Sequence, residues 1–466
     1  MMMNRFLSAL LVVCVISNSV QGLAFPKGAA SDEVANSNPS NPLIFTQTLN
    51  HFDDEDTRTF SQRYFINDAY YNYAKGGPVI LYINGEGPVT SAPSSSSDAV
   101  VIYAQALGAC IVTLEHRYYG GSSPFDDLST ENLKFLNSRQ ALNDLAVFIV
   151  SFTNNLSNAG KVVTIGGSYS GALSAWFRIK YPHLTVGSIA SSGVVNSILD
   201  FTAFDEWVAY AAGQECANAL RAVTKAAESM IFQGGEYEAQ VKQLFSAESL
   251  TDNGDFFYFL ADSLSEGIQY GFHYELCNPL IEAMNSNGDI LEVYSNYTHN
   301  VWSPMLGIPD EYATSWQQNT TVDFNKADRQ WWFQTCSQLG WFQPAPENDP
   351  IRSTQVNMTY FQNHCEQVFG VAMWPNVENT NIYYGGNNTA GTNILYINGS
   401  QDPWSRASVI STLSPTQQSV TVTCMTCGHC VDLRGCPGGC PSPNNLDQVR
   451  QLSIDSIKSW LAAASN

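Results

Sequence analysis

Short apolar runs alternate with amphipathic segments in the first part of the chain. Continuous apolar runs occur at 77–84, 109–115, 162–165 and 186–191. Residues 138–152 instead carry apolar side chains at helical spacing. Buried strands that alternate with helices are typical of a mostly parallel sheet covered by helices. The pattern over residues 45–200 therefore predicts the first part of an α/β core.

The pattern changes at about residue 201. Segments such as 217–231 and 256–270 have helical periodicity, and no comparable apolar strand follows until Ile394. We interpret residues 201–380 as an inserted, mainly helical cap. Residues 381–466 then form the second part of the core, which closes with an amphipathic helix over 445–463.

The first 22 residues have the three parts of a secretory signal peptide. Arg5 supplies a positive charge, residues 6–16 are apolar, and 20–22 form a small-residue cleavage site. This run is too short for a stable membrane span. Residues 23–44 are predicted to be a disordered lead-in or a propeptide. The mature protein is expected in the secretory pathway, either extracellular or lysosomal or vacuolar, without stable membrane insertion.

Composition narrows the classes of partner. The 466 residues are 44% hydrophobic and 14% charged, and the net charge is −21. An acidic surface disfavours nucleic acid and anionic membranes as partners. It suits an acidic compartment, so activity is expected to be optimal below neutral pH. Peptide substrates are the expected partners, and the sequence leaves a homodimer open.

A glycine-flanked serine follows the β-branched run at 162–165. Ser168 lies within Gly-Gly-Ser-Tyr-Ser-Gly (166–171), and a helical segment begins directly after it. A serine on a sharp turn between a strand and a helix is typical of the nucleophile elbow of α/β-hydrolases. Ser170 stands where that motif has glycine, and a glycine-rich turn without chemistry is the alternative. The predicted fold class is α/β, with an α/β-hydrolase core and an inserted helical cap.

The partners that a nucleophilic serine needs occur in the expected chain order. Asp402 follows the apolar strand at 394–397, and His429 follows a second strand that contains Val420 and Val422. In α/β-hydrolases the order is serine, aspartate, histidine. The sequence therefore predicts Ser168, Asp402 and His429 as the catalytic residues, with Asp402 and His429 in hydrogen-bonding reach of one another.

The same fold class predicts the oxyanion hole. Its donors are the N–H after the nucleophile, here that of Tyr169, and an N–H from the loop after an early strand. The loop Asn-Gly-Glu-Gly at 84–87 has that position, which makes Glu86 and Gly87 the candidates. A plain turn is the alternative for this loop.

Eleven cysteines include Cys14 in the signal segment, so an even number remains in the mature chain. In an oxidising compartment these are expected to form disulfides. Five of them surround His429, namely Cys424, Cys427, Cys430, Cys436 and Cys440. A zinc site with His429 as ligand is the alternative, but metal ligation would remove His429 from catalysis. We therefore expect no metal and no cofactor, and disulfides that hold the loop of His429.

Glycosylation motifs agree with a secreted protein. They begin at Asn155, Asn296, Asn319, Asn357 and Asn387. A further motif at Asn398 lies in the predicted Asp402 loop and is expected to stay unmodified.

Several motifs together resemble the S28 family of serine peptidases, which includes lysosomal prolyl carboxypeptidase, dipeptidyl peptidase II and thymus-specific serine protease. The motifs are LNHF (49–52), FSQRY (60–64), NGEG (84–87), EHRYYG (115–120), GGSY (166–169), DPW (402–404) and HCVDL (429–433). The residues after Ser168 are most similar to the thymus-specific branch. The resemblance extends from about Phe45 nearly to the C-terminus.

The resemblance implies a serine exopeptidase that acts near proline. It also implies that Trp404 contacts the apolar side chain at substrate position P1, with core packing as the alternative. Ala172 is expected one turn beyond the nucleophile, near this pocket, and it departs from the better-studied members. Dipeptidyl peptidase and carboxypeptidase activity both remain open. A lipase or esterase on the same fold, or a catalytically inactive binding protein, are the other hypotheses.

Overall fold

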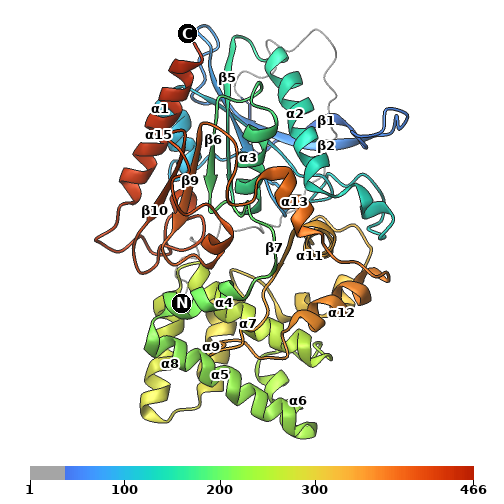
Figure 1. The fold of residues 1–466 in the computed structure, drawn as a ribbon, viewed down its shortest axis with the longest axis vertical. Coiled ribbons are helices and arrows are strands. Elements are labelled where there is room, and N and C mark those ends of the chain that lie inside the picture. The colour runs from blue at the N-terminus through green and yellow to red at the C-terminus, as the bar shows by residue number, and fades with distance from the viewer. Residues whose placement is uncertain (1–36, 466) are drawn as a thin grey trace, which may run out of the picture.

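The computed structural model describes residues 37–465. The predicted signal segment lies outside these residues. A helix-covered sheet forms one end of the molecule, and a group of helices forms the other end (Figure 1). Among the described residues, no helix combines the length and the apolar character that crossing a membrane requires.

The central sheet has eight strands among the described residues, in the order β1-β2-β4-β3-β5-β6-β9-β10. Their bounds are β1 Leu43–Thr48, β2 Thr59–Asn67, β3 Gly77–Ile83, β4 Cys110–Leu114, β5 Ala159–Gly167, β6 Gly187–Ser191, β9 Ile394–Gly399 and β10 Gln417–Val422. Strands β3 to β10 pair in parallel, whereas β2 is antiparallel to both of its neighbours. This is the arrangement of an α/β-hydrolase fold, as predicted.

Helices cover both faces of this sheet. They are α1 Ala99–Leu107, α2 Ser138–Asn155, α3 Tyr169–Lys180, α14 Val431–Arg434 and α15 Leu446–Ala463. Side chains along β3 alternate between two hydrophobic clusters: Ile80 packs with residues of α1 and α15, and Leu81 packs with residues of α2 and α3. This alternation follows from the pleat of a strand that is buried on both faces.

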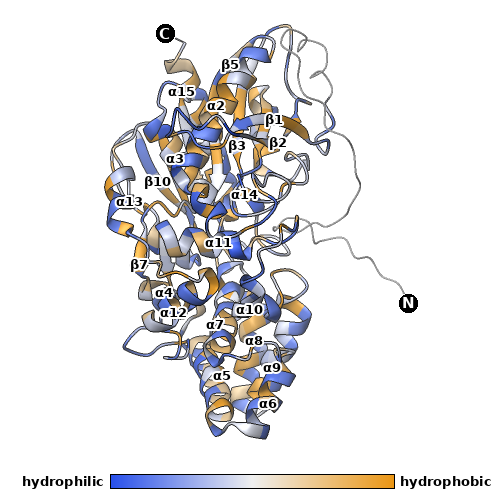
Figure 2. Cartoon of the chain, turned by 90° about the vertical axis from the view of Figure 1, so that its right-hand side faces the viewer, coloured by the Kyte–Doolittle hydropathy of each residue, from blue (hydrophilic) through white to orange (hydrophobic). Residues whose placement is uncertain are grey.

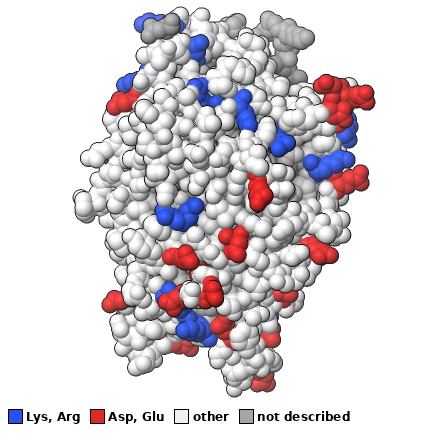
Figure 3. Space-filling model, viewed as in Figure 1, with Lys and Arg blue, Asp and Glu red and all other residues white. Residues whose placement is uncertain are grey.

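The helical end of the molecule comes from the segment between β6 and β9. Its helices are α4 Thr202–Ala212, α5 Gln214–Gln233, α6 Gly235–Leu244, α7 Asn253–Gln269, α8 His273–Ser286, α9 Ile290–Tyr297, α10 Thr314–Gln317, α11 Asp328–Gln334, α12 Met358–Phe369 and α13 Val377–Tyr384. Figure 2 shows that hydrophobic and hydrophilic residues alternate along these helices, as on amphipathic helices that pack together. Figure 3 shows acidic side chains gathered over this half of the face in view.

The structure corrects several predicted details. Strand β1 begins at Leu43 and pairs with β2, so the lead-in ends before residue 44, and Ser37 is already hydrogen-bonded to Ile66. Strand β8 (Gly340–Phe342) lies within the region expected to be mainly helical, and it pairs in parallel with β7 (Ile198–Asp200) at the end of the predicted first part of the core. Helix α13 returns to the core, where Tyr384 stacks on Trp176 at 4.1 Å between ring centroids.

Candidate active site

Ser168 lies at the turn between β5 and α3, where the sequence places it. Its backbone has φ 63° and ψ −128°, a conformation that residues other than glycine rarely adopt. The Ser168 N–H donates to the carbonyl of Ser191 on β6 at 2.9 Å. This bond fixes the turn at the carboxyl edge of the sheet, and the Ser168 residue remains partly exposed.

Small residues are required around this turn because backbone atoms approach very closely. A Cβ on Gly166 would lie 2.1 Å from the Ser170 carbonyl oxygen, and one on Gly171 would lie 2.6 Å from that of Ser191. Ser170, which replaces the expected glycine, is tolerated because its hydroxyl bonds within the turn. It donates to the Gly167 carbonyl at 2.6 Å and accepts from the Gly167 N–H at 3.1 Å. The hydroxyl of Ser170 is thus engaged in holding the turn.

Asp402 and His429 are hydrogen-bonded to one another, as predicted from their positions after β9 and β10. The His429 Nδ1 lies 3.0 Å from Oδ1 and 2.9 Å from Oδ2 of Asp402. Both residues are buried. Asp402 also accepts the Trp404 N–H at 2.9 Å, which orients the carboxylate. A carboxylate can only accept here, so His429 Nδ1 carries the proton and Nε2 is free to act as a base.

The backbone donors predicted for an oxyanion hole face no protein acceptor. Within the described residues, neither the Tyr169 N–H nor the Gly87 N–H donates a hydrogen bond to the protein. The 84–87 loop lies against the serine turn, because a Cβ on Gly85 would be 3.6 Å from the Ser170 Cβ. Burial raises the pKa of the Glu86 carboxyl, although its own backbone N–H and His429 lower it. Ser168 Oγ makes no hydrogen bond in the described part of the chain. Catalytic hydrogen bonds are often completed only when substrate binds.

Trp404 lies beside His429, with ring centroids 6.3 Å apart. It is surrounded by aromatic side chains of the helical segment, namely Phe201, Phe204 and Trp341, at centroid distances of 5.8, 5.1 and 6.0 Å. The structure does not bring Ala172 to the surface of the site. Its side chain points into the core, and the residue has no exposed surface.

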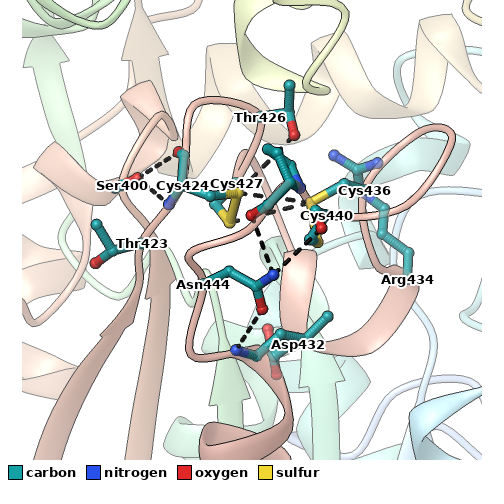
Figure 4. The surroundings of a disulfide bond; sticks show 12 residues. Ser400, Thr423, Cys424, Thr426, Cys427, Asp432, Arg434, Cys436, Cys440 and Asn444 are labelled. Carbon is teal, nitrogen blue, oxygen red and sulfur yellow. Dashed lines mark hydrogen bonds between the residues drawn. A yellow bond between two sulfur atoms is a disulfide. The ribbon is translucent and has the colours of Figure 1, made fainter.

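The loop of His429 contains two short disulfides, Cys424–Cys427 and Cys436–Cys440, shown in Figure 4. The sulfurs of the two bonds are in contact, with Cys436 Sγ at 3.8 Å from Cys424 Sγ. Ser400 Oγ ties the loop to β9 by donating to the Cys424 carbonyl at 3.0 Å. The four sulfurs lie within 4.8 Å of one another, a spacing compatible with a metal, but they are paired as disulfides.

Two cysteines depart from the expected full pairing. Cys110 and Cys430 are free, whereas Cys216–Cys277 and Cys336–Cys365 form two further disulfides in the helical segment. Cys110 is buried within β4. Cys430 lies beside the serine turn, because a Cβ on Gly167 would be 2.9 Å from its Sγ. Its Sγ lies 3.8 Å from the Ser191 carbonyl, and it takes part in no disulfide.

We expect that removing the Cys436–Cys440 bond lowers the rate of peptide hydrolysis, while it lowers the free energy of unfolding less than removal of Cys216–Cys277 does. Chain entropy assigns about 2 kcal/mol to a bond that spans 4 residues and about 4 kcal/mol to one that spans 61, as Cys216–Cys277 does. The test compares the double variants Cys436→Ser/Cys440→Ser and Cys216→Ser/Cys277→Ser by peptide hydrolysis and by thermal unfolding. Mild reduction of the wild type should likewise lower activity before unfolding. The expectation fails if the first variant keeps full activity, or if mass mapping finds these thiols free.

The electrostatics of His429 bear on the pH dependence. Burial is the largest single influence and disfavours the imidazolium, but the charge and hydrogen bond of Asp402 together with Cys430 outweigh burial, so the pKa of His429 is raised. A general base must be neutral, so activity should rise with pH through this pKa. The structure thus argues against the optimum below neutral pH that the net charge suggests.

We therefore expect kcat/KM for an N-blocked peptide to be at least about tenfold lower at pH 5 than at pH 7.5, because an ordinary histidine already titrates near 6.5. The blocked substrate has no amino group that titrates in this range. Rates of labelling by a fluorophosphonate provide a second measure. A profile that is flat or highest near pH 5 would contradict this expectation.

The family resemblance implies that residues 115–119 shape the site, without a chemical step for them, and the structure places them in a set of buried polar residues behind it. The Glu115 carboxylate accepts hydrogen bonds from the Val89 N–H at 2.9 Å and the Gly121 N–H at 3.0 Å, and thereby holds the end of the 84–89 loop. Arg117 makes two hydrogen bonds of 2.6 Å to Asp144. Arg117 also donates to the Leu49 carbonyl at 2.9 Å, and the Gln62 amide donates to the Glu115 carbonyl at 2.8 Å. The LNHF, FSQRY and EHRYYG motifs thus meet in one buried network that supports the loops of the site.

Gln269, the last residue of α7, was missed by sequence reasoning. Its carbonyl accepts the His429 N–H at 2.7 Å, and its side-chain oxygen accepts the Trp404 Nε1–H at 2.9 Å. A Cβ on Gly428 would lie 2.0 Å from this carbonyl. The helical segment therefore contacts the site directly. A glutamine at a helix end has no local signal that would have revealed this.

Comparison with known proteins identifies the family. The family model for serine carboxypeptidase S28 matches residues 47–452, which is most of the chain. The chain belongs to the serine carboxypeptidase S28 family. As an S28 member it is a serine-type peptidase, and its substrates are peptides.

Relatives of this S28 peptidase match along nearly their whole length. The probable serine protease EDA2 of Arabidopsis thaliana is 40% identical, over 91% of this chain and 89% of the relative. The thymus-specific serine protease of Homo sapiens is 29% identical, over 90% and 86%. The lysosomal Pro-X carboxypeptidase of Homo sapiens is 28% identical, over 90% and 88%.

Proposed function

We propose that this S28 peptidase is an exopeptidase that cleaves next to proline or small apolar residues through an acyl-enzyme, with Ser168, His429 and Asp402 as its catalytic triad. The observation that carries the proposal is the buried Asp402–His429 pair, joined at 2.9 and 3.0 Å, at the same edge of the sheet as the strained serine turn.

The proposed reaction has two steps. The Ser168 Oγ attacks the scissile carbonyl carbon while His429 Nε2 takes the hydroxyl proton, and then gives it to the leaving amine as the C–N bond breaks. Water then attacks the acyl-enzyme in the same manner, which releases the acid and restores Ser168. Asp402 holds the Nδ1–H tautomer throughout and stabilises the imidazolium that forms.

Two backbone N–H groups would stabilise the oxyanion of each tetrahedral intermediate. The N–H of Tyr169 and that of Gly87 have no acceptor in the described chain, which suits this role. A single oxyanion donor contributes on the order of 10²–10³ in kcat. Glu86 belongs to the same loop, and we assign its backbone to the wall of the hole.

The proposed P1 pocket is the aromatic group formed by Trp404 with Phe201, Phe204 and Trp341. Flat apolar rings suit a proline ring or a small apolar side chain. The name of the lysosomal Pro-X carboxypeptidase agrees with such a preference. Either a dipeptidyl peptidase or a carboxypeptidase is compatible with this pocket.

We also propose that the protein follows the secretory route to the cell exterior or to a lysosomal or vacuolar compartment. Four disulfides among the described residues suit an oxidising compartment. The five predicted glycosylation sites are exposed, while Asn398 is buried and is expected to remain unmodified.

The proposal is tested by labelling and by substrate choice. A biotinylated fluorophosphonate should label the purified protein, and peptide mapping should find the label on Ser168. Proline-containing peptides with free and with blocked amino termini are then assayed in parallel. Preference for a free amino terminus indicates a dipeptidyl peptidase, and tolerance of the block with a free carboxyl terminus indicates a carboxypeptidase. Cleavage only within long peptides blocked at both ends would refute the exopeptidase assignment.

A further inference from the structure

We propose that Gln334, on helix α11 of the cap, is a positioning residue that orients Tyr169 and thereby the oxyanion donor beside Ser168. The inference rests on the proposed function, because that function gives the Tyr169 N–H its role. Gln334 lies far from the catalytic motifs in the sequence, and nothing in its surroundings there indicates such a role.

The contacts of Gln334 join the cap to the catalytic turn. Its amide Nε2 donates to the Tyr169 hydroxyl at 2.8 Å, and its Oε1 accepts from the Tyr119 hydroxyl at 2.6 Å. All three side chains are fully buried. Both ends of one amide are therefore occupied by tyrosines of the core, and water cannot substitute for either bond without entering the interior.

The protonation of His116, which also contacts Tyr169, determines which atoms donate in this network. His116 Nδ1 lies 2.8 Å from the Arg117 carbonyl, which can only accept, so Nδ1 carries a proton. Burial lowers the pKa of His116 to about 4, so the ring is neutral and Nε2 is an acceptor. The Tyr169 hydroxyl, at 3.3 Å, therefore donates to Nε2.

This direction leaves one role for Gln334. Because the Tyr169 O–H is directed at His116 as a donor, its oxygen accepts on the other side, and the amide N–H of Gln334 is the donor that it meets. The Tyr119 hydroxyl then donates to the Gln334 oxygen. The side-chain amide supplies a donor and an acceptor at the two places that need them, which neither a carboxylate nor an apolar side chain can do.

Tyr169 is well placed to transmit this constraint to the reaction centre. It directly follows Ser168 and is the first residue of α3, so the bonds that hold its side chain also hold the Cα and the backbone from which its N–H extends. Trp331, also on α11, packs on the Tyr169 ring with centroids 5.7 Å apart. The cap therefore holds Tyr169 by a hydrogen bond and by a ring contact from one helix.

Gln330 provides a matched control one helical turn before Gln334. Its Nε2 also crosses from α11 to the core, where it donates to the Tyr118 carbonyl at 3.1 Å. It is also buried, and among the described residues its amide makes hydrogen bonds to the Tyr118 and Lys326 carbonyls but none to Tyr169. Gln330→Met and Gln334→Met thus remove similar interface hydrogen bonds, and only the second removes the link to the catalytic turn.

The experiment uses the full-length secreted protein. We expect Gln334→Met to lower kcat for a proline-containing peptide about tenfold or more, with KM changed less than about threefold, because oxyanion stabilisation acts in the transition state. The rate of fluorophosphonate labelling at Ser168 should fall in parallel. Gln330→Met should stay within about twofold of the wild type, and thermal unfolding shows whether both variants are folded.

Gln334→Glu adds a readout that a purely structural role would not produce. The ionised carboxylate cannot donate to Tyr169, whereas the protonated acid can, so the ratio of variant to wild-type kcat should rise as the pH is lowered. The titratable groups that face this position are Tyr119, Tyr169 and His116, with Glu86, Asp328 and Tyr384 next in the field of the two tyrosines. They are common to both proteins, as is His429, so the ratio isolates residue 334.

Two results would overturn the proposal: a folded Gln334→Met with unchanged kcat and labelling rate, or an equal loss in Gln330→Met. A ratio for Gln334→Glu that does not vary with pH would also count against it. Failure of the proposed function is distinguishable, because the fluorophosphonate label would then be found at a residue other than Ser168.

Discussion

Replacement of Ser168 by alanine should abolish peptide hydrolysis and leave the fold unchanged. We expect kcat to fall on the order of 10⁴–10⁶-fold, as for the loss of a triad nucleophile. The Ser168 hydroxyl makes no hydrogen bond in the described residues, and the backbone bond to the Ser191 carbonyl is kept, so stability should change little. The measurements are hydrolysis of a proline-containing peptide, active-site labelling and thermal unfolding.

Ser170→Ala is the matched control, two residues away in the same turn. It removes the two hydrogen bonds that the Ser170 hydroxyl makes to Gly167, so it should lower stability by about 1–2 kcal/mol. Activity should fall far less than in Ser168→Ala, because the reacting hydroxyl is retained. An active Ser168→Ala protein together with an inactive Ser170→Ala protein would show that Ser170 is the nucleophile.

The strands of the parallel sheet were predictable from the sequence, because strands buried on both faces are continuous apolar runs. The predicted run at 77–84 corresponds to β3 (Gly77–Ile83) and the run at 109–115 to β4 (Cys110–Leu114). Strand β2 was missed because its residues alternate between exposed and buried over its first half, a weaker signal than a continuous run.

The positions of Asp402 and His429 were predictable because each follows a strand of a parallel sheet, and the carboxyl ends of such strands meet at one edge. Their hydrogen bond depends on that topology. The contacts of Gln269 and Gln334 were not predictable, because they cross between the cap and the core over more than a hundred residues of chain. The sequence also could not show that Cys430 is left unpaired, since five cysteines crowd one loop and pairing depends on distances between their sulfurs.

Asp402→Asn should produce the second largest loss, with the fold retained. The asparagine oxygen can still accept the Trp404 N–H, while its amide N–H₂ takes the place of the oxygen that faces His429 Nδ1. Because that amide donates, Nδ1 becomes an acceptor and the proton moves to Nε2, which then cannot take the proton of Ser168. In a serine protease triad the equivalent change lowers kcat about 10⁴-fold, and we expect a similar loss in peptide hydrolysis here.

The control for charge and burial is Asp432→Asn, in helix α14 directly after the loop of His429. Asp432 is buried, burial raises its pKa to about 6, and its Oδ1 accepts from the Ser191 hydroxyl, a bond that asparagine can also accept. Within the described residues, the side-chain hydrogen bond of Asp432 goes to Ser191, and the His429 ring bonds to Asp402. Asp432→Asn should therefore keep activity within about tenfold of the wild type.

The pH profile of Asp402→Asn distinguishes a changed tautomer of His429 from a loss of packing around it. Removal of the carboxylate also removes the main influence that raises the pKa of His429, and burial then lowers that pKa. The acid limb of the residual kcat/KM should therefore move to lower pH than in the wild type, while the plateau stays far below it. Asp432→Asn should leave the limb in place. Activity of Asp402→Asn within tenfold of the wild type, or an unmoved acid limb, would show that Asp402 does not orient His429.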